Sequence, residues 1–219
     1  MAVKNFVDFL LFEKNYSKHT VVAYKRDIEM FELFLSKEFS KSNASNANYS
    51  QIRSWIVNLV SKNISNRTIN RKISSLNSYY KFLLKIQAVK LNPLIKHKAL
   101  KVSKKLQIPF SEIEIISVLN MIEIDSFEGL RNKLIVEMFY STGMRRTELV
   151  NLQLSDIDVS KCQVKVIGKR NKERFIPLLQ TVLETYKAYI AVRSSVKNSN
   201  NSNFIFLTKD GLRVYDKLV

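Results

Sequence analysis

The sequence predicts a mainly α-helical protein of two domains, the second of which adds a small antiparallel β-hairpin or sheet. Only four glycines and three prolines occur in 219 residues, which favours long helices over tight turns. Apolar residues recur at helical spacing up to residue 86, and alternation typical of strands begins near residue 157. Two of the three prolines fall in a basic stretch between these regions, where we expect a domain boundary.

Four helices are expected in the N-terminal region, because each has an apolar stripe at helical spacing. They cover residues 2–13, 17–39, 50–61 and 65–86. Ser17 and Ser65 are the residue type that caps a helix N-terminus, and the polar segment 40–50 reads as a loop. Amphipathic helices of these lengths bury their stripes by packing into a bundle, so residues 1–88 are predicted to form the first domain.

The next segment, residues 89–109, is predicted to be an extended basic linker. It carries Pro93 and Pro109 together with several lysines, and it shows no amphipathic period. Two interpretations stay open for its charge. The segment is either a solvated connector or a linker whose charge helps two domains to hold a polyanion between them.

The second domain, residues 110–219, is expected to mix helices and strands. SEIE at 111–114 has the pattern of a capping box, and Gly143 is typical of a helix C-terminus. Helices are predicted from 111, over 127–141, from about 145 to 152 and over 178–195. Short strands are predicted around 157–159, 164–167 and 175–176, and the basic segment GKRNKER (168–174) forms the hairpin between the last two.

The bulk charge predicts a polyanionic partner. Lys and Arg number 36 against 19 Asp and Glu, which gives a net charge of +17. A generally basic soluble protein, such as a ribosome-associated one, is the alternative. The single cysteine, Cys162, cannot form an internal disulfide, which fits a reducing cytoplasm. Charges interrupt the apolar N-terminus, so neither a signal peptide nor a membrane span is expected there.

One candidate site lies in STGMRRTELVNL, where Arg145 and Arg146 directly follow a predicted turn. Cations are disfavoured in the first turn of a helix, so Arg145 is placed to meet an anion there. Glu148 is placed to orient it. The alternative is an Arg–Glu pair with a structural role only.

The second candidate is the hairpin tip GKRNKER. Its cations Lys169, Arg170, Lys172 and Arg174 could enter a groove or lie along phosphates. Lys169, next to Gly168, could deliver a proton to a leaving oxygen. An ordinary solvated hairpin tip is the competing interpretation.

Taken together, these two segments resemble tyrosine recombinases of the Xer and phage-integrase type. TGMRRTELVNLQLSDID and VKVIGKRNKERFIPL are similar to that family's TG-L-R-x-S-E-L-x-x-L segment and to its strand pair carrying GKGNKER. TVVAYKRDIEMFELFL and TINRKISSLNSYYKFLLK are similar to its N-terminal SAM-like core-binding domain. The resemblance implies a SAM-like four-helix bundle joined by a linker to an α+β catalytic domain.

The resemblance also implies roles for individual residues. Arg145 matches the arginine that binds the scissile phosphate, Lys169 the lysine that protonates the leaving 5′-oxygen, and Glu148 a buried glutamate with an orienting role. A tyrosine would attack the phosphodiester to give a 3′-phosphotyrosyl intermediate, without a metal or cofactor. Double-stranded DNA is the implied partner, with further recombinase protomers in a tetramer.

DNA contacts in the first domain are expected on its second and fourth helices. The candidates there are Lys18, Lys25, Arg26, Arg67, Asn70, Arg71 and Ser74, and in the second domain they are Arg146, Arg170 and Lys172. Each of these side chains taken alone could also be an ordinary solvated group.

The sequence departs from the family where the rest of the site should follow. Its two histidines, His19 and His97, both precede Arg145, so the H-x-x-R pair is missing. Tyr186 and Tyr189 have the spacing of packed residues, and Tyr215 comes before the place where H-x-x-R is expected, so no nucleophile is assigned. We therefore expect a C-terminally truncated recombinase that binds DNA without cleaving it and is monomeric without DNA.

Two other functions remain possible from the sequence alone. One is a shortened, non-catalytic and regulatory DNA-binding protein. The other is a helical RNA-binding protein whose likeness to recombinases is accidental, which predicts no use for the Arg145–Lys169 arrangement.

Overall fold

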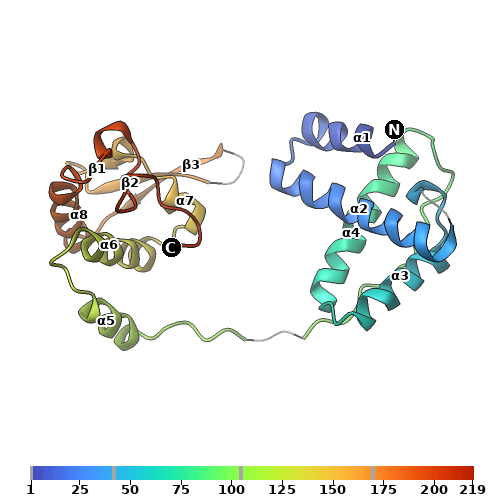
Figure 1. The fold of residues 1–219 in the computed structure, drawn as a ribbon, viewed down its shortest axis with the longest axis horizontal. Coiled ribbons are helices and arrows are strands. Elements are labelled where there is room, and N and C mark those ends of the chain that lie inside the picture. The colour runs from blue at the N-terminus through green and yellow to red at the C-terminus, as the bar shows by residue number, and fades with distance from the viewer. Residues whose placement is uncertain (1, 41–42, 104–105, 169–170) are drawn as a thin grey trace. The chain divides into compact units, whose positions relative to one another are not determined.

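The computed structural model describes residues 2–40, 43–103, 106–168 and 171–219. The chain divides into two compact units, Met1–Leu106 and Gln107–Val219. The first unit is helical, and the second combines helices with a three-stranded antiparallel sheet (Figure 1). The predicted fold class is confirmed. Among the described residues, no helix combines the length and the apolar character that crossing a membrane requires.

The first unit follows the predicted helix boundaries closely. Its elements are α1 (Ala2–Asp8), a wider π-helical turn (Phe9–Glu13), α2 (Lys18–Phe39), a 3₁₀ turn (Ala44–Asn46), α3 (Tyr49–Ser61) and α4 (Asn66–Lys85). Ser17 and Ser65 cap α2 and α4, because each side-chain oxygen accepts the backbone N–H three residues on. Asn48 caps α3 in the same way, with Gln51 returning a bond to its backbone.

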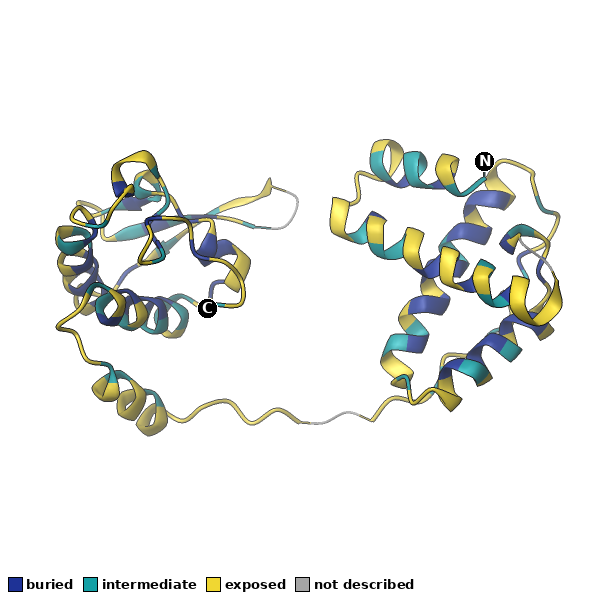
Figure 2. Cartoon of the chain, in the orientation of Figure 1, coloured by how far each residue is buried: buried dark blue, intermediate teal, exposed yellow. Residues whose placement is uncertain are grey.

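The core of the first unit is aromatic, and the helices turn their buried sides toward it (Figure 2). Phe31 of α2 lies against Trp55 of α3, with ring centroids 5.0 Å apart. Phe6 of α1 meets Tyr79 of α4 edge-on at 5.3 Å. Burying each such ring contributes roughly 1.5–3 kcal/mol, so these contacts join α1, α2, α3 and α4 into one body.

Part of the predicted linker, residues 89–109, packs on the first unit. Leu94 is buried in the core, and the Asn70 amide holds Leu100 through both of its backbone groups, at 2.9 Å each. Leu106 and Ile108, in contrast, are 96% and 92% exposed. The basic composition did not reveal this docking, because it depends on one amide of α4 and one leucine in a turn.

The second unit begins after Leu106. Its elements are α5 (Glu112–Met121), α6 (Phe127–Thr142), α7 (Arg146–Val150), a 3₁₀ turn (Leu154–Asp156), β1 (Ile157–Asp158), β2 (Gln163–Ile167), β3 (Glu173–Pro177), α8 (Gln180–Arg193) and a 3₁₀ turn (Ser199–Asn201). The sheet order is β1-β2-β3, and all neighbours are antiparallel. Val164 and Val166 of β2 face the core, so Lys165 between them faces the other side of the sheet.

Two sequence signals in this unit are confirmed. Ser111 and Glu114 form the predicted capping box at the start of α5, with reciprocal bonds of 2.7 and 3.3 Å. Gly143 ends α6 with a left-handed φ of +59° and donates its N–H to Phe139. Glycine adopts this left-handed conformation more readily than residues with a Cβ, and α7 follows three residues later.

A C-terminal segment completes the core of the second unit. Arg193 of α8 is buried and donates to the carbonyl oxygens of Ser202, Phe204 and Ile205 at 2.7–3.1 Å. Ile205 in turn donates its backbone N–H to Leu152, just after α7. These bonds hold Phe204 beside the segment that follows α7.

Candidate functional site

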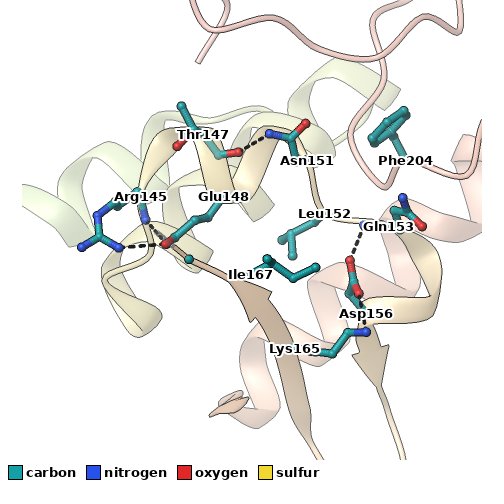
Figure 3. Close-up of a pocket in the computed structure, with 11 residues that line it drawn as sticks. Arg145, Thr147, Glu148, Asn151, Leu152, Gln153, Asp156, Lys165, Ile167 and Phe204 are labelled. Atoms are coloured by element: carbon teal, nitrogen blue, oxygen red, sulfur yellow. Dashed lines mark hydrogen bonds and ion pairs between the residues drawn. The ribbon is translucent and has the colours of Figure 1, made fainter. Parts of the chain in front are cut away.

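A cleft of about 700 Å³ opens in the second unit between α7, β2 and the C-terminal segment (Figure 3). It is lined by Arg145, Thr147, Glu148, Asn151, Leu152, Gln153, Asp156, Lys165, Ile167, Gly168 and Phe204. Both parts of the sequence motif, TGMRRTEL and the start of GKRNKER, thus contribute to one cleft.

Arg145 owes its position to the turn before it. After Gly143, the buried Met144 anchors the chain, and Arg145 then adopts an extended backbone with φ −77° and ψ 150°. Arg145 is therefore the N-cap of α7, one position before the first turn in which the sequence predicts it. Its side chain is 67% exposed and lines the cleft.

The Glu148 carboxylate binds both the backbone and the guanidinium of Arg145. One carboxylate oxygen, Oε2, accepts the backbone N–H of Arg145 at 2.7 Å, and the other, Oε1, accepts its Nη1 at 2.9 Å. The Glu148 side chain is only 5% exposed. The backbone bond is the carboxylate half of a capping box, so the same group caps the N-terminus of α7 and orients the guanidinium.

Arg174 of β3 is a second partner of Glu148, whereas the sequence predicts it only as one of the cations of the hairpin tip. Its Nη1 and Nη2 donate to Oε1 and Oε2 of Glu148 at 3.0 and 2.8 Å. The Arg174 hydrogen bonds lower the pKa of Glu148, and the bonds from Arg145 add to this, so that despite burial the pKa falls to about 2. Glu148 in return raises the pKa of Arg174.

Gly168 follows the end of β2 and allows a close approach there. A Cβ at this position would lie 3.2 Å from Arg174 Nη1 and 3.3 Å from Glu148 Oε1, which is tighter than ordinary side-chain contacts. The Gly168 N–H donates to the carbonyl of Lys172 at 2.8 Å, which closes the hairpin. The glycine therefore allows the hairpin to approach the arginine–glutamate cluster closely.

Lys165 is a further cation of the cleft that the sequence analysis missed. Its Nζ lies 3.6 Å from Asp156, whose carboxylate also accepts the backbone N–H of Gln153 at 2.9 Å (Figure 3). The alternation of β2 places Lys165 opposite its buried neighbours, but that alternation does not show what the other face adjoins. Only the folded chain brings it beside α7.

The remaining predicted residues of the second unit are not gathered in this cleft. Lys169 and Arg170 lie outside the described residues, so the predicted convergence of Arg145 and Lys169 stays a prediction. Lys172 is exposed, and Arg146 approaches Asp216 at 3.4 Å on the surface.

The tyrosines that follow the hairpin divide into buried and exposed ones. Tyr186 and Tyr189 are buried in the core of the second unit, and the Tyr189 hydroxyl donates to Ile205 at 3.0 Å. Tyr215 is 58% exposed.

In the first unit, most predicted DNA contacts lie on the surfaces of α2 and α4. The exposed ones are Lys18, Lys25, Arg26, Arg67, Arg71 and Ser74. Lys25 pairs with Glu29 at 3.6 Å, and Asn70 is the residue that holds Leu100. The exposed side chains are free to contact DNA. The Asn70 amide is not, because it bonds the backbone of Leu100.

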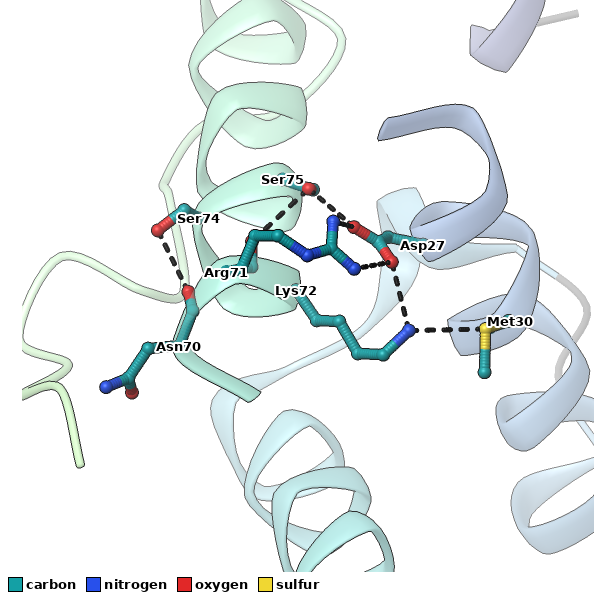
Figure 4. A network of polar contacts seen from close by, with 7 residues as sticks. All are labelled: Asp27, Met30, Asn70, Arg71, Lys72, Ser74 and Ser75. Carbon is teal, nitrogen blue, oxygen red and sulfur yellow. Dashed lines mark hydrogen bonds and ion pairs between the residues drawn. The ribbon is translucent and has the colours of Figure 1, made fainter. Parts of the chain in front are cut away.

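Arg71 belongs to a network around Asp27 (Figure 4). Arg71 donates to both Asp27 oxygens at 2.6 and 3.0 Å, Lys72 donates at 3.0 Å, and Ser75 donates at 2.8 Å. Burial acts to raise the pKa of Asp27, but these hydrogen bonds outweigh it and hold the pKa below its ordinary value. The network fastens α4 to α2 and keeps the exposed part of Arg71 in one place.

The arrangement in the second unit suits an anion. Two arginines and one carboxylate leave the Arg145–Glu148–Arg174 cluster with a net charge of +1, and its most exposed member faces the cleft. Among the described residues, no group of three or more His, Cys, Asp and Glu side chains is placed to hold a metal ion.

Comparison with known families covers almost the whole chain. A family model described as "Phage integrase, N-terminal SAM-like domain" matches residues 3–87, and one described as "Phage integrase family" matches residues 108–219. Tyrosine recombinase XerC of Staphylococcus haemolyticus is 32% identical over 212 residues, which are 97% of this chain and 70% of that protein. XerC of Staphylococcus saprophyticus is 37% identical over 195 residues, 89% of this chain and 64% of that protein.

Solved structures show the same fold. The Tn1549 transposon integrase in complex with circular intermediate DNA matches with a TM-score of 0.72 at 18% identity, over 97% of this chain and 73% of that chain. A lambda integrase tetramer bound to a Holliday junction matches with a TM-score of 0.71 at 13% identity, over 99% of this chain and 61% of that chain. At these identities the likeness concerns the fold alone.

Proposed function

The chain belongs to the phage integrase family of tyrosine recombinases, and from this membership we propose that its two units hold duplex DNA while Arg145 binds the phosphate at which a strand is exchanged. Lys169 is the proposed acid that protonates the leaving 5′-oxygen. The reaction class is DNA phosphodiester transesterification through a 3′-phosphotyrosine, which serves site-specific recombination.

The observation that carries this proposal is the fixed but exposed guanidinium of Arg145. Its Nη1 and backbone N–H are held by Glu148, and among the described residues its other side-chain N–H groups have no protein acceptor. Gly168, directly before Lys169, lines the same cleft. A phosphodiester carries one negative charge, which matches the net charge of the arginine–glutamate cluster.

The chemistry needs such a group. Attack on a phosphodiester adds negative charge to the non-bridging oxygens in the transition state, and a guanidinium held in advance stabilises that charge without reorganising. Glu148 is not the base of this reaction. Its carboxylate accepts four hydrogen bonds, and its pKa of about 2 leaves it little affinity for a proton.

The first unit supplies affinity for DNA in this proposal. The exposed cations of α2 and α4 contact phosphates, and the exposed Lys90, Lys96, Lys98 and Lys101 add to the positive charge of this unit. Contacts of this kind act in the cytoplasm, where the single free Cys162 also fits. Assembly with further recombinase protomers into a tetramer on DNA is part of the same proposal.

We further propose that the 219-residue polypeptide binds DNA without cleaving it. The tyrosines that follow the hairpin and are buried, Tyr186 and Tyr189, are committed to the core, and both histidines lie in the first unit. The second candidate function, a non-catalytic DNA-binding protein, makes the same prediction for this polypeptide.

A nicked suicide duplex tests cleavage directly. Duplexes are first selected from a random library for tight binding, and nicked versions are then incubated with the polypeptide and separated under denaturing conditions. We expect a retarded complex in native gels and no covalent protein–DNA adduct in denaturing gels. A covalent adduct would show that the polypeptide includes a working nucleophile. Equal affinity for DNA and for a heparin-like polyanion would refute the proposal that the two units hold duplex DNA.

A further inference from the structure

The Arg174 side chain is placed to control Arg145 although it belongs to a different element. It reaches from β3 to Glu148 with two hydrogen bonds, while Arg145 reaches the same carboxylate from the start of α7. Glu148 is the only group that the two arginines share among the described residues. Any change at Arg174 therefore acts on Arg145 through one carboxylate.

Sharing changes the charge that Arg145 presents. Each oxygen of Glu148 accepts two hydrogen bonds, which uses the full accepting capacity of a carboxylate. Without Arg174, the carboxylate would have only Arg145 as a cationic partner. A one-to-one ion pair is neutral, so it attracts an external anion less strongly than the present cluster with its net charge of +1.

The same contact ties the hairpin to α7. Arg174 pairs with Val166 across the sheet, and a Cβ on Gly168 would press tightly against the Arg174–Glu148 pair. Two points of contact therefore set where β2 and β3 leave the sheet relative to Arg145. The segment that they carry includes Lys169.

We infer that Arg174 is a positioning residue of the phosphate site, which keeps Arg145 extended toward the bound phosphate by sharing Glu148 and which fixes the hairpin to α7. The inference rests on the proposed function, because it needs Arg145 to contact a phosphate. It differs from direct binding by Arg174, whose guanidinium would then hold a phosphate of its own.

Phosphate ethylation interference separates these roles on any tightly binding duplex, so the natural target site is not needed. A duplex selected from the random library is ethylated at about one phosphate per molecule, and positions at which ethylation blocks binding are mapped for each variant. Arg145→Ala should lose interference at one phosphate and bind about 10- to 100-fold more weakly. Arg174→Ala should lose interference at that same phosphate and bind about 5- to 30-fold more weakly.

Two further variants protect the test from a folding artefact. Arg174→Lys keeps the charge but cannot make the two-pronged contact, so it should lose the same interference while keeping the wild-type melting temperature within a few degrees. The double variant Arg145→Ala/Arg174→Ala should bind no more weakly than Arg145→Ala, because the two residues act through one contact. Lys161→Ala, which removes an exposed ion pair with Asp158, is the matched control and should leave the map unchanged.

The outcomes distinguish the two proposals. If Arg145→Ala changes no phosphate, the proposed phosphate site is wrong whatever Arg174 does. If Arg145→Ala removes one phosphate but Arg174→Ala and Arg174→Lys keep it, Arg174 does not position Arg145. Loss of a different phosphate in both Arg174 variants, with additive weakening in the double variant, would show direct binding and overturn the inference.

Discussion

Each unit holds a carboxylate between two cationic side chains, and the two networks differ in what they leave exposed. Around Asp27, Lys72 is nearly buried, with 9% of its side chain exposed, and Ser75 completes the set inside the bundle. Around Glu148, Arg145 is 67% exposed and lines a cleft. The first network joins two helices, whereas the second holds a cation ready for a ligand.

The comparison shows that a shared carboxylate does not by itself indicate a site. Asp27 and Glu148 have lowered pKa values for similar reasons, since hydrogen bonds from cations outweigh burial. What separates them is whether a cation retains unused donors beside open space. This criterion selects Arg145, and it leaves Arg71, which is half-exposed, as the intermediate case.

Asp27→Ala is expected to lower the free energy of unfolding more than any other change considered. The change leaves Lys72 buried without its carboxylate, which should destabilise the first unit by about 3–5 kcal/mol. Urea unfolding followed by fluorescence measures this cleanly, because the only tryptophan, Trp55, lies in the core of that unit. Lys25→Ala, which removes an exposed pair with Glu29, is the control and should cost less than about 1 kcal/mol. A similar loss of unfolding free energy in both variants would contradict a stabilising role for the buried Asp27–Lys72 pair.

Acidification should weaken both networks, because each depends on an ionised carboxylate whose pKa is lowered in the folded chain. The pKa of Glu148 falls from an ordinary value of 4.5 to about 2 in the folded chain. Its contribution of about 3 kcal/mol is therefore complete above about pH 4.5 and is lost as the pH falls toward 2. Unfolding free energies measured by hydrogen exchange in β2 and β3 from pH 7 to pH 2.5 should fall in this window. In Glu148→Gln the same segment should lose this part of its pH dependence, and an unchanged profile would show that Glu148 does not carry it.

The smallest effect is expected from Arg71→Ala, which tests the intermediate case. Asp27 keeps Lys72 and Ser75, so the stability loss should be about 1 kcal/mol. If Arg71 also contacts a DNA phosphate, the slope of log affinity against log salt should decrease in magnitude by about 0.9. An unchanged slope would show that Arg71 only stabilises the network around Asp27 and does not contact a DNA phosphate, in contrast to the role proposed for Arg145.

Local sequence signals anticipated much of the architecture. Ser17, Ser65, Ser111 and Gly143 marked helix ends correctly, because a cap depends on residues within one turn of the chain. The ion pair between Arg145 and Glu148 was also predicted from their spacing of three residues. The docking of Leu94 and Leu100 on the first unit was not, because it depends on contacts distant in sequence.

The sequence by itself determined the helix ends, the strand alternation, the excess of positive charge and the motif around Arg145. Each of these depends on neighbouring residues or on composition. Only the tertiary structure decided that Arg174 and Lys165 join that motif, since the antiparallel pairing of β2 and β3 and the packing of the sheet beside α7 bring them there. Contacts between segments 26 residues apart, such as Glu148 with Arg174, arise from the free energy of packing the whole unit, which no local pattern encodes.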